Sequence, residues 1–534
     1  MRIARSKIRA ALGSLLILAV PAQFVVASPF KDIQLKPIGT YSAGAFDEGA
    51  AEIVAHDPKT QRLFVVNGAT SSIDVLSISD PTAPTLLFSI SLAPYGGQAN
   101  SIAVDKGVVA AAVEAEIKTD PGKVVFFDAA APDETQAFIS ALEVGALPDM
   151  LTFTPNGKYV LVANEGEPND DYSIDPEGSV SIIDLKHGAS RVTQSDVRTA
   201  TFTAFDGATL DASIRIFGPG ASVAEDLEPE YITVSHDSKT AWVTLQENNA
   251  LGILNIKEGV FTGLSGLGFK DHSLPGNALD ASDRDGRINI ANWPVFGMYQ
   301  PDAIASFRYR GDTFLITANE GDARQYDAFA EEVRVNALKL DPIVFPDATF
   351  IKNSARLGRL NVTKTLGDAD GDGDHDALYA FGARSFSIRD ASGALVFDSG
   401  DQIEQITAQI LPAFFNSNND SNNSFDTRSD NKGPEPEGVT VGELYGRTYA
   451  FIGLERIGGV MVYDVTVPTS PRFIQYVNNR DFSGNAAAGT AGDLGPEGLL
   501  FIRAGDSPTH QPLLVVANEV SGTTTVYEIS RAGK

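Results

Sequence analysis

The sequence predicts an all-β fold, a seven-bladed β-propeller closed by an N-terminal strand that pairs into the last blade. Three observations lead to this prediction. A pair of short apolar strands recurs seven times along the chain. The first strand of each pair opens on an acidic or amide residue, and the second usually ends on glutamate. The last repeat lacks a fourth strand, and strand-built repeats of roughly forty to fifty residues are typical of propellers and solenoids.

Each repeat contains runs of alternating apolar and polar residues, rich in β-branched and aromatic side chains and separated by Gly, Asp and Pro turns. This pattern predicts four strands per repeat. In the first four repeats the predicted strands are 51–55, 62–66, 72–78 and 85–92; 101–104, 108–113, 123–127 and 136–142; 150–153, 159–163, 179–184 and 199–205; and 231–234, 240–245, 251–256 and 260–267.

The fifth repeat is stretched by a long insertion between its inner and outer strand pairs. The predicted strands of the last three repeats are 303–309, 313–317, 384–388 and 394–397; 438–441, 448–453, 460–465 and 472–477; and 498–502, 513–517 and 523–529. An eight-bladed alternative would split the fifth repeat in two. It is disfavoured because 377–397 lacks an inner strand pair that opens on an acidic residue.

The missing fourth strand of the last repeat has a candidate at 33–41, an extended run with no partner in its own repeat. Pairing this run into the last blade removes two exposed strand edges. We therefore expect the propeller to be closed by its N-terminal strand.

Composition limits the classes of partner. Of the 534 residues 43% are hydrophobic, which is enough for a sizeable core. The net charge of −28 and the pI of 4.5 argue against a nucleic-acid partner, because phosphate recognition needs clustered Lys and Arg. The same acidity suits divalent cations. The cysteine count of 0 excludes disulfides and thiol catalysis.

The N-terminus predicts export. Residues 1–27 have four basic residues, an apolar stretch at 10–20 that is short for a membrane span, and small residues before Ser28, as in a secretory signal peptide. No later segment has about 18 uninterrupted apolar residues, so no transmembrane span is expected. We expect a periplasmic or secreted protein in which 28–534 form one propeller domain. The sequence leaves the oligomeric state open.

Long insertions are expected at about 166–178, 268–299, 321–376 and 399–434. Strand alternation places all of them on the face where the repeats open on acidic residues. Long loops on one face of a rigid scaffold usually carry function.

Two sets of acidic residues are predicted to form rings on that face, because the start of one antiparallel strand lies beside the end of its partner. The inner set is Glu48, Asp149, Glu230, Asp302, Glu437 and Glu497, with Asn100 as the uncharged member. The outer set is Glu114, Glu165, Glu247, Glu320, Glu455 and Glu519, with Asn67 as the exception. Converging carboxylates need cations or Arg partners. The alternative is that each acid caps its own blade by accepting backbone N–H bonds.

A local motif predicts a calcium loop. Its alternate carboxylates and its Gly at the sixth position match the first nine residues of an EF-hand-type loop, with Asp368, Asp370, Asp372, Asp374 and Asp376 as ligands. Position twelve is Tyr379 instead of Glu, so a shorter loop type with a structural role is expected. The alternative is a solvated acidic turn, although five carboxylates in nine residues repel one another without a cation.

Basic residues are scarce, yet several lie in loops of the acidic face. These are Arg324, Arg384, Arg428, Lys432 and Arg456. Cationic side chains beside metal-binding carboxylates suit a phosphoryl site, because metal and guanidinium share the charge on the phosphate. Neutralisation of the acidic rings by ion pairs is an equally good interpretation.

With these residues in hand, the chain resembles the choice-of-anchor I domain family, which is related to mesenchyme-specific cell-surface glycoproteins. The resemblance rests on 163–167, 317–322, 379–388 and 428–438. It implies an exported propeller, often followed by a C-terminal anchor. Here the chain ends at Lys534, five residues after the last predicted strand, so no anchor is expected. Relatives are often labelled alkaline phosphatase or likened to phytase-like esterases.

Two functional hypotheses follow. The first is a calcium-dependent phosphoesterase, with a second divalent metal allowed, in which Glu437 and Glu497 hold metal, Arg384 and Lys432 hold phosphate, and water is the nucleophile. In it Arg324, Arg428 and Arg456 would help to bind the substrate, a small phosphoester. The second hypothesis is a calcium-stabilised propeller that binds a surface ligand without catalysis.

Overall fold

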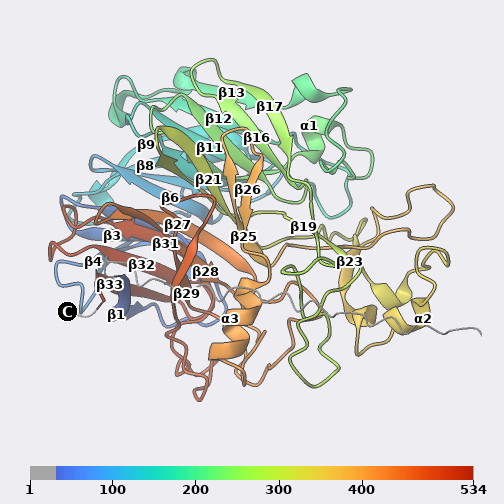
Figure 1. The fold of residues 1–534 in the computed structure, drawn as a ribbon. Helices are drawn as coiled ribbons and strands as arrows, with labels where there is room; N and C mark the ends of the chain where they lie inside the picture. The colour runs from blue at the N-terminus through green and yellow to red at the C-terminus, as the bar shows by residue number, and fades with distance from the viewer. Residues whose placement is uncertain (1–31, 533–534) are drawn as a thin grey trace, which may run out of the picture.

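The computed structural model describes residues 32–532 (Figure 1). The predicted signal peptide at 1–27 lies outside the described residues. Among those residues no helix is long and apolar enough to cross a membrane.

Within the described range the chain forms seven four-stranded antiparallel sheets. The first four sheets, each in the order in which its strands pair, are β2 (Val54–Asp57), β3 (Arg62–Asn67), β4 (Ser72–Ser77) and β5 (Thr85–Ser91); β6 (Ala99–Asp105), β7 (Val108–Val113), β8 (Pro121–Asp128) and β9 (Phe138–Ala146); β10 (Pro148–Phe153), β11 (Tyr159–Asn164), β12 (Ser179–Asp184) and β13 (Val197–Thr201); and β14 (Pro229–Val234), β15 (Thr240–Leu245), β16 (Ala250–Asn255) and β17 (Val260–Gly266). The fifth and sixth are β20 (Ile304–Tyr309), β21 (Asp312–Asn319), β25 (Ser385–Asp390) and β26 (Leu395–Asp398); and β27 (Pro436–Leu444), β28 (Arg447–Leu454), β29 (Val460–Asp464) and β30 (Arg472–Val477). The last sheet combines the two ends of the described chain, in the order β1 (Ile33–Ser42), β33 (Thr523–Arg531), β32 (Leu513–Asn518) and β31 (Pro496–Ile502).

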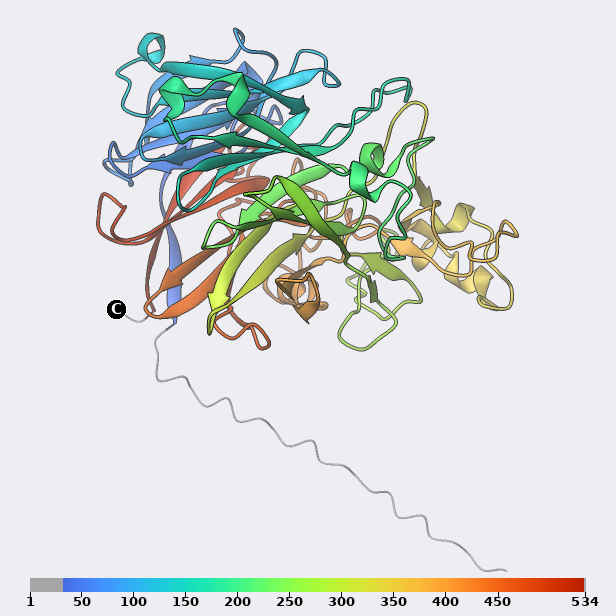
Figure 2. The same cartoon turned by 90° about the horizontal axis from the view of Figure 1, so that it is seen from above.

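The first strands of neighbouring sheets lie against one another in a closed order. β2 contacts β6, and the contacts continue through β10, β14, β20, β27 and β31 back to β2. The sheets therefore surround a common axis as in a β-propeller, and Figure 2 shows them arranged around it.

Apolar clusters fill the spaces between neighbouring sheets, because side chains alternate between the two faces of a strand. On β3, Phe64 packs with Val109 of the next sheet. Its neighbours Leu63 and Val65 pack with Val515 of the last sheet. The inner strands are buried on both faces, so each sheet is held between its two neighbours.

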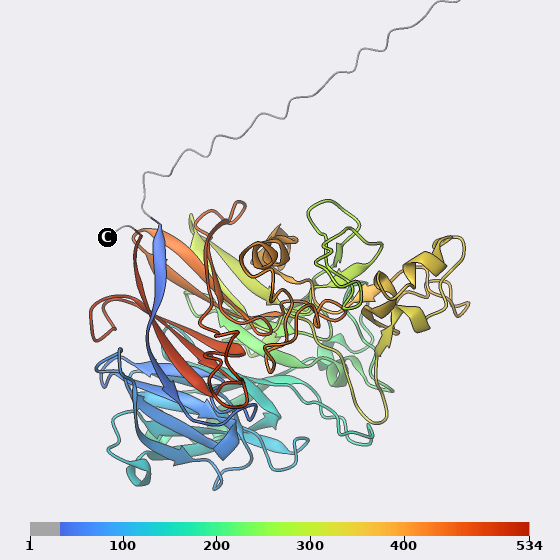
Figure 3. The ribbon, with the colours of Figure 1, turned by 90° about the horizontal axis from the view of Figure 1, so that it is seen from below.

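β1 forms the outer edge of the last sheet. It pairs antiparallel with β33 from Ile33, opposite Arg531, to Ser42, opposite Thr523 (Figure 3). A register irregularity lies between Pro37 and Gly39. A Cβ atom on Gly39 would lie 2.4 Å from the carbonyl oxygen of Pro81, so glycine is required at this close approach.

The predicted inner strands agree with the observed ones to within a few residues, and the largest shift is in the first repeat. There the strand predicted at 51–55 is observed at Val54–Asp57. In the third repeat the strand predicted at 199–205 ends at Thr201 and is followed by a 3-10 turn.

The insertions at 268–299 and 321–376 build a small layer beside the propeller, seen where α2 (Ala348–Ile351) lies in Figure 1. It contains β18 (Phe269–Asp271), β19 (Phe296–Met298) and β24 (Tyr379–Ala380) in one sheet, and β22 (Glu332–Arg334) and β23 (Asn361–Thr363) in another. This layer has an apolar cluster of its own that includes Trp293, Val335 and Leu360.

Two further α-helices lie in connections between sheets. α1 (Val223–Asp226) precedes the fourth sheet and is capped by Ser222. α3 (Gln402–Ile410) lies in the insertion at 399–434, where Ile403 packs into the core between the fifth and sixth sheets.

Candidate functional site

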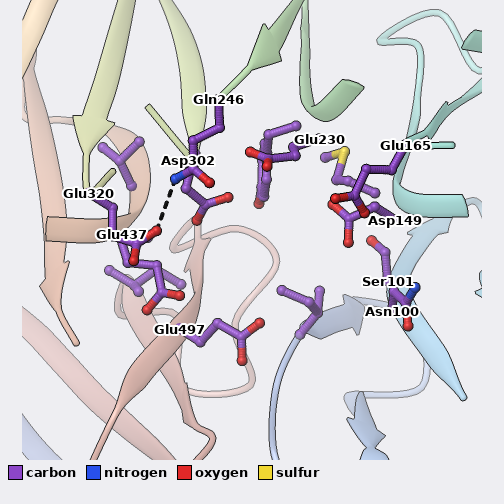
Figure 4. Close-up of a pocket in the computed structure, with 17 residues that line it drawn as sticks. Asn100, Ser101, Asp149, Glu165, Glu230, Gln246, Asp302, Glu320, Glu437 and Glu497 are labelled. Atoms are coloured by element: carbon purple, nitrogen blue, oxygen red, sulfur yellow. Dashed lines mark hydrogen bonds between the residues drawn. The ribbon is translucent and has the colours of Figure 1, made fainter. Parts of the chain in front are cut away.

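A cavity of about 220 Å³ lies where the first strands of the sheets meet. Its acidic lining residues are Asp149, Glu165, Glu230, Asp302, Glu320, Glu437 and Glu497 (Figure 4). Asn100, Ser101, Tyr231 and Gln246 add amide and hydroxyl groups, and no Lys or Arg is among the residues that line it. The predicted inner ring and part of the outer ring therefore converge on one space.

A shared feature of the first strands positions these acids. In β31, Leu499 pairs with Val516, and Glu497 lies two residues earlier, beside a register irregularity. β27 has the same arrangement at Glu437, two residues before Val439. Such bulges re-aim a side chain out of the ladder. They direct these carboxylates toward the axis.

Glu48 is a correction to the predicted inner ring. It is exposed and does not line the cavity. The acid two residues before Val54, the first residue of β2, is Glu52, and burial raises the pKa of Glu52 to about 8 with help from nearby Glu519. The prediction was wrong because it used the opening Asp47-Glu48-Gly49, whereas β2 begins only at Val54. Counting back two residues from Val54 finds Glu52.

Burial dominates the electrostatics of the ring. It raises the pKa of Glu230, Glu437 and Glu497 well above the ordinary range, and neighbouring carboxylates add to the shift. The pKa of Asp149 is raised to about 7 by burial and then by Glu167. Carboxylates in this situation hold protons or need a cation.

Several carboxylate oxygens have no donor. One oxygen, Oε2, of each of Glu230, Glu437 and Glu497 is buried without a hydrogen-bond partner among the described residues. The Glu230 side chain is only 8% exposed. By contrast, Gln246 donates its Nε2 hydrogen bond to Glu320 Oε2 at 2.9 Å (Figure 4). The unpartnered oxygens fit a cation, because leaving them bare is costly.

The carboxylate oxygens of one group lie close enough together to share a metal ion. Asp302, Glu320 and Glu437 each offer an oxygen, and these oxygens lie within 4.8 Å of one another. Several carboxylate oxygens are the ligand set that Ca²⁺ and Mg²⁺ prefer. The residues present therefore fit a divalent cation at this side of the cavity.

Glu435, which the sequence analysis did not identify, binds the Arg and Lys side chains next to this group. It accepts hydrogen bonds from Arg428 and Arg456, and its Oε2 lies 3.2 Å from Lys432 Nζ. These cations outweigh the effect of burial and hold the pKa of Glu435 well below its usual range. Lys432 Nζ also lies 2.5 Å from Glu320 Oε1. Three of the predicted phosphate or substrate contacts thus form ion pairs within the protein.

Arg384 lies outside the cavity lining. Its Nη1 donates to Glu404 at 2.7 Å and to the Asp280 carbonyl at 2.6 Å. Its Nη2 donates to the carbonyls of Ser429 and Asn431 at 2.8 and 2.7 Å. The guanidinium therefore ties the insertion at 399–434 to the propeller.

Arg324 is likewise buried, at 3% exposure, and lies outside the cavity lining. It pairs with Asp226, and its Nη2 lies 2.9 Å from Glu228 Oε2. Its guanidinium also stacks 4.5 Å from the ring centroid of Phe217.

The predicted calcium loop lies in the insertion at 321–376, apart from the cavity lining. Asp368, Asp370 and Asp376 bring one oxygen each within 4.8 Å of the others, and Asp374 and Asp376 form a second group with Asp341. Asp372 belongs to neither group and instead accepts the Asp374 N–H at 3.0 Å. Four of the five acids of the loop therefore belong to two groups that share Asp376.

Several known proteins are similar to this chain in sequence or in structure. The model of the choice-of-anchor I domain matches residues 52–468. Gigasin-3a from Magallana gigas is 33% identical over 194 residues, 34% of this chain and 66% of that protein. Mesenchyme-specific cell surface glycoprotein from Strongylocentrotus purpuratus is 26% identical over 274 residues, 45% of this chain and 35% of that protein. The chain thus spans just under two thirds of the first relative and about one third of the second. A solved chain of Kuenenia stuttgartiensis hydrazine synthase has a TM-score of 0.47 at 13% identity, covering 92% of this chain and 99% of that one.

Proposed function

Because the chain belongs to the choice-of-anchor I domain family, we propose that it is an exported β-propeller that binds a divalent cation in its central cavity. Calcium is the preferred candidate for this cation. One observation carries the proposal. The Glu230 side chain lines the cavity, is 8% exposed and has a carboxylate oxygen without a partner among the described residues. Export rests on the signal-peptide pattern at 1–27, and a periplasmic or secreted location follows from it.

The proposal includes a seven-bladed propeller closed by β1. Seven four-stranded sheets in the described range and a cyclic contact order of their first strands support the blade number. The pairing of β1 with β33 supports the closure. Closure keeps the ring of carboxylates rigid, because it removes the exposed edges through which the last sheet could separate from its neighbours.

Cation binding explains the charge of the cavity better than phosphate binding does. Seven carboxylates line a space without Lys or Arg in its lining. A phosphate entering this space alone would meet charges of its own sign, whereas a cation would meet unpartnered oxygens. Asp302, Glu320 and Glu437 would hold the cation, and Glu230 and Glu497 would face it across the cavity or hold a second one.

Calorimetric titration tests the cation site. Calcium added to protein freed of metal should bind in the cavity, and Glu437→Gln should remove that binding. Glu48→Gln is the matched control, because Glu48 is an exposed glutamate outside the cavity lining. Unchanged calcium binding in Glu437→Gln, or equal loss in the control, would contradict the assignment of the site.

The second candidate function is hydrolysis of a phosphomonoester or diester, with calcium as the metal. It is favoured by one contact, because Lys432 touches Glu320 of the metal group and could share the charge of a phosphate bound there. A bound divalent cation would activate water and withdraw charge from the phosphate. Glu437 and Glu497 would hold the metal, and Lys432 would position the phosphate. Arg384 would take part only by giving up its carbonyl and carboxylate partners.

A panel of phosphoesters at alkaline pH separates the two candidates. The enzyme hypothesis expects turnover that EDTA abolishes and calcium restores, and that Glu437→Gln loses while keeping its melting temperature. Calcium binding without turnover on the whole panel supports a binding propeller without catalysis.

A second, structural calcium is proposed for the loop at 368–376. Its support is the motif itself and the compact group formed by Asp368, Asp370 and Asp376. The ion would fix the insertion rather than serve the cavity.

A further inference from the structure

A groove on the small layer beside the propeller has no role in the cation site. We call it the insertion groove. It is lined by Trp293, Pro294, Val295, Phe296, Val344, Phe345, Phe350, Ile351, Ala377 and Leu378, with Asp271, Ser273, Asn292, Asp347 and Asp376 completing its lining. Its volume is about 450 Å³, within the range of roughly 300–1,000 Å³ of small ligand sites.

Large apolar side chains stand exposed in this groove, at Val344 and Phe350, and beside Val344 at Ile343. Ile343 is 86% exposed, Val344 51% and Phe350 48%. The backbone of the turn at Ile343 and Val344 is fixed by Asp341, because both N–H groups donate to its Oδ1 at 2.7 Å. Single exposed apolar residues are ordinary. Three in one short segment that continues a hollow are typical of an interaction site.

Trp293, which lines the groove, has an unused hydrogen-bond donor. Trp293 is 8% exposed, and its indole N–H has no acceptor among the described residues. Buried indole N–H groups usually have a partner, and leaving one unpaired is costly. Trp242, the other tryptophan, donates to the Ala391 carbonyl at 2.9 Å. An occupant that carries a carbonyl oxygen would satisfy this N–H if binding turned the indole toward the groove.

The polar rim of the groove is negative. Neither Asp271 nor Asp347 forms an ion pair with a Lys or Arg within residues 32–532, whereas Asp376 belongs to the predicted calcium loop. Arg356 stacks on the ring of Phe350, 3.3 Å from its centroid. The rim therefore complements a positively charged occupant, and the net charge of −28 would also attract such a partner over a distance.

We propose that the insertion groove binds an extended peptide segment of another protein, one in which a large apolar side chain is flanked by lysine or arginine. The apolar side chain fills the hollow against Trp293 and Phe350. A peptide carbonyl accepts the Trp293 N–H, and the basic side chains reach Asp271 and Asp347. A peptide is favoured over a small molecule because the exposed side chains of Ile343 and Val344 extend the apolar contact beyond the hollow.

The test uses the intact protein and an acetylated, amidated Lys-Leu-Lys-Leu-Lys peptide, followed by calorimetry. We expect one peptide to bind per chain. Val344→Asp places a carboxylate in the apolar contact and should weaken binding at least about tenfold. Asp347→Asn should weaken it about two- to fivefold, the effect of one exposed ion pair. Both positions are exposed, so both variants should fold.

Matched controls make the result specific. Asp120→Asn, an exposed aspartate far from the groove in sequence, should bind the peptide as the unchanged protein does. Peptides with glutamate in place of lysine, or serine in place of leucine, should not bind. In a Trp242→Phe background the fluorescence of Trp293 should change on peptide addition.

Four results would overturn the proposal. The first is no heat of binding with the lysine–leucine peptide, and the second is equal binding by Val344→Asp. The third is equally tight binding of benzyltrimethylammonium, which would identify a small-cation site. The fourth is concentration-dependent dimerisation that Val344→Asp abolishes, which would show that a second copy of this chain covers the groove.

Discussion

The central cavity and the loop at 368–376 are both acidic, but their carboxylates are solvated differently. In the cavity, Glu230 is 8% exposed and keeps an oxygen without a donor. In the loop, Asp368 is exposed and accepts backbone N–H bonds from Gly371 and Gly373 at 2.8 and 3.0 Å. The loop can therefore keep its charges with or without a cation. The cavity depends on protons, ion pairs or a metal, so burial rather than the number of acids decides where a cation matters.

The largest expected effect concerns Glu435, whose charge is compensated by protein cations instead of a metal. Glu435→Gln removes the buried negative charge that pairs with Arg428, Arg456 and Lys432. Breaking such a network lowers the free energy of unfolding by about 3–5 kcal/mol. Denaturant unfolding measures the loss. Glu443→Gln, an exposed glutamate at the end of β27, should change stability by less than about 0.5 kcal/mol. A similar small change in Glu435→Gln would show that these cations find other partners.

The next effect is a pH dependence of stability that arises from the buried acids around the central cavity. Burial raises the pKa of Asp149 from 3.8 to about 7 and that of Glu52 from 4.5 to about 8. Between about pH 4 and pH 8 the folded protein therefore keeps protons that the unfolded chain has lost. The free energy of unfolding of calcium-free protein should fall as pH rises through this window, by about 1.4 kcal/mol per pH unit for each titrating group.

Unfolding in urea with EDTA, at several pH values across that window, measures this fall. Calcium should reduce it, because a cation stabilises the charged carboxylates that the rise in pH creates. A flat profile without calcium would show that the cavity acids are hydrated well enough to ionise freely.

The arrangement of strands could be predicted from the sequence because each strand carries its own signal. Short continuous apolar runs, as in Arg62–Asn67 and Leu513–Asn518, indicate a strand buried on both faces. The convergence of Glu437 and Glu497 also followed, since it depends on antiparallel pairing within each repeat. Both inferences rest on patterns within one repeat.

The assignment of individual charges could not be predicted in the same way. Glu435 and Glu437 are two residues apart in one motif, yet one binds three cations and the other faces the cavity. Glu435 has a positive φ of 50°, which turns its side chain away from the direction of the Glu437 side chain, and no residue pattern predicts this backbone angle. Arg384 has as its partners Glu404 and carbonyls up to 104 residues away in sequence, which only the folded chain reveals.

A third prediction separates charge from shape in the cavity. Glu230→Gln keeps the side chain's size and removes a carboxyl group that ionises more readily in the unfolded chain than in the fold, so calcium-free protein should become more stable by about 1 kcal/mol at about pH 8. Calcium should then raise the melting temperature less than it does in the unchanged protein. Glu48→Gln should alter neither quantity, because Glu48 is exposed. Destabilisation of the calcium-free protein by Glu230→Gln would mean that the carboxylate serves the fold and not a cation.

The smallest expected effect on stability lies in the loop. Asp370→Ala combined with Asp372→Ala should remove one bound calcium and make the insertion at 321–376 more sensitive to protease. The free energy of unfolding should change by less than about 0.5 kcal/mol, because both side chains are exposed. Calcium binding in the cavity should be unaffected, so calorimetry should lose one class of site and keep the other. An unchanged number of bound calcium ions would remove the loop site, and loss of both classes would show that the loop and the cavity are coupled through the insertion.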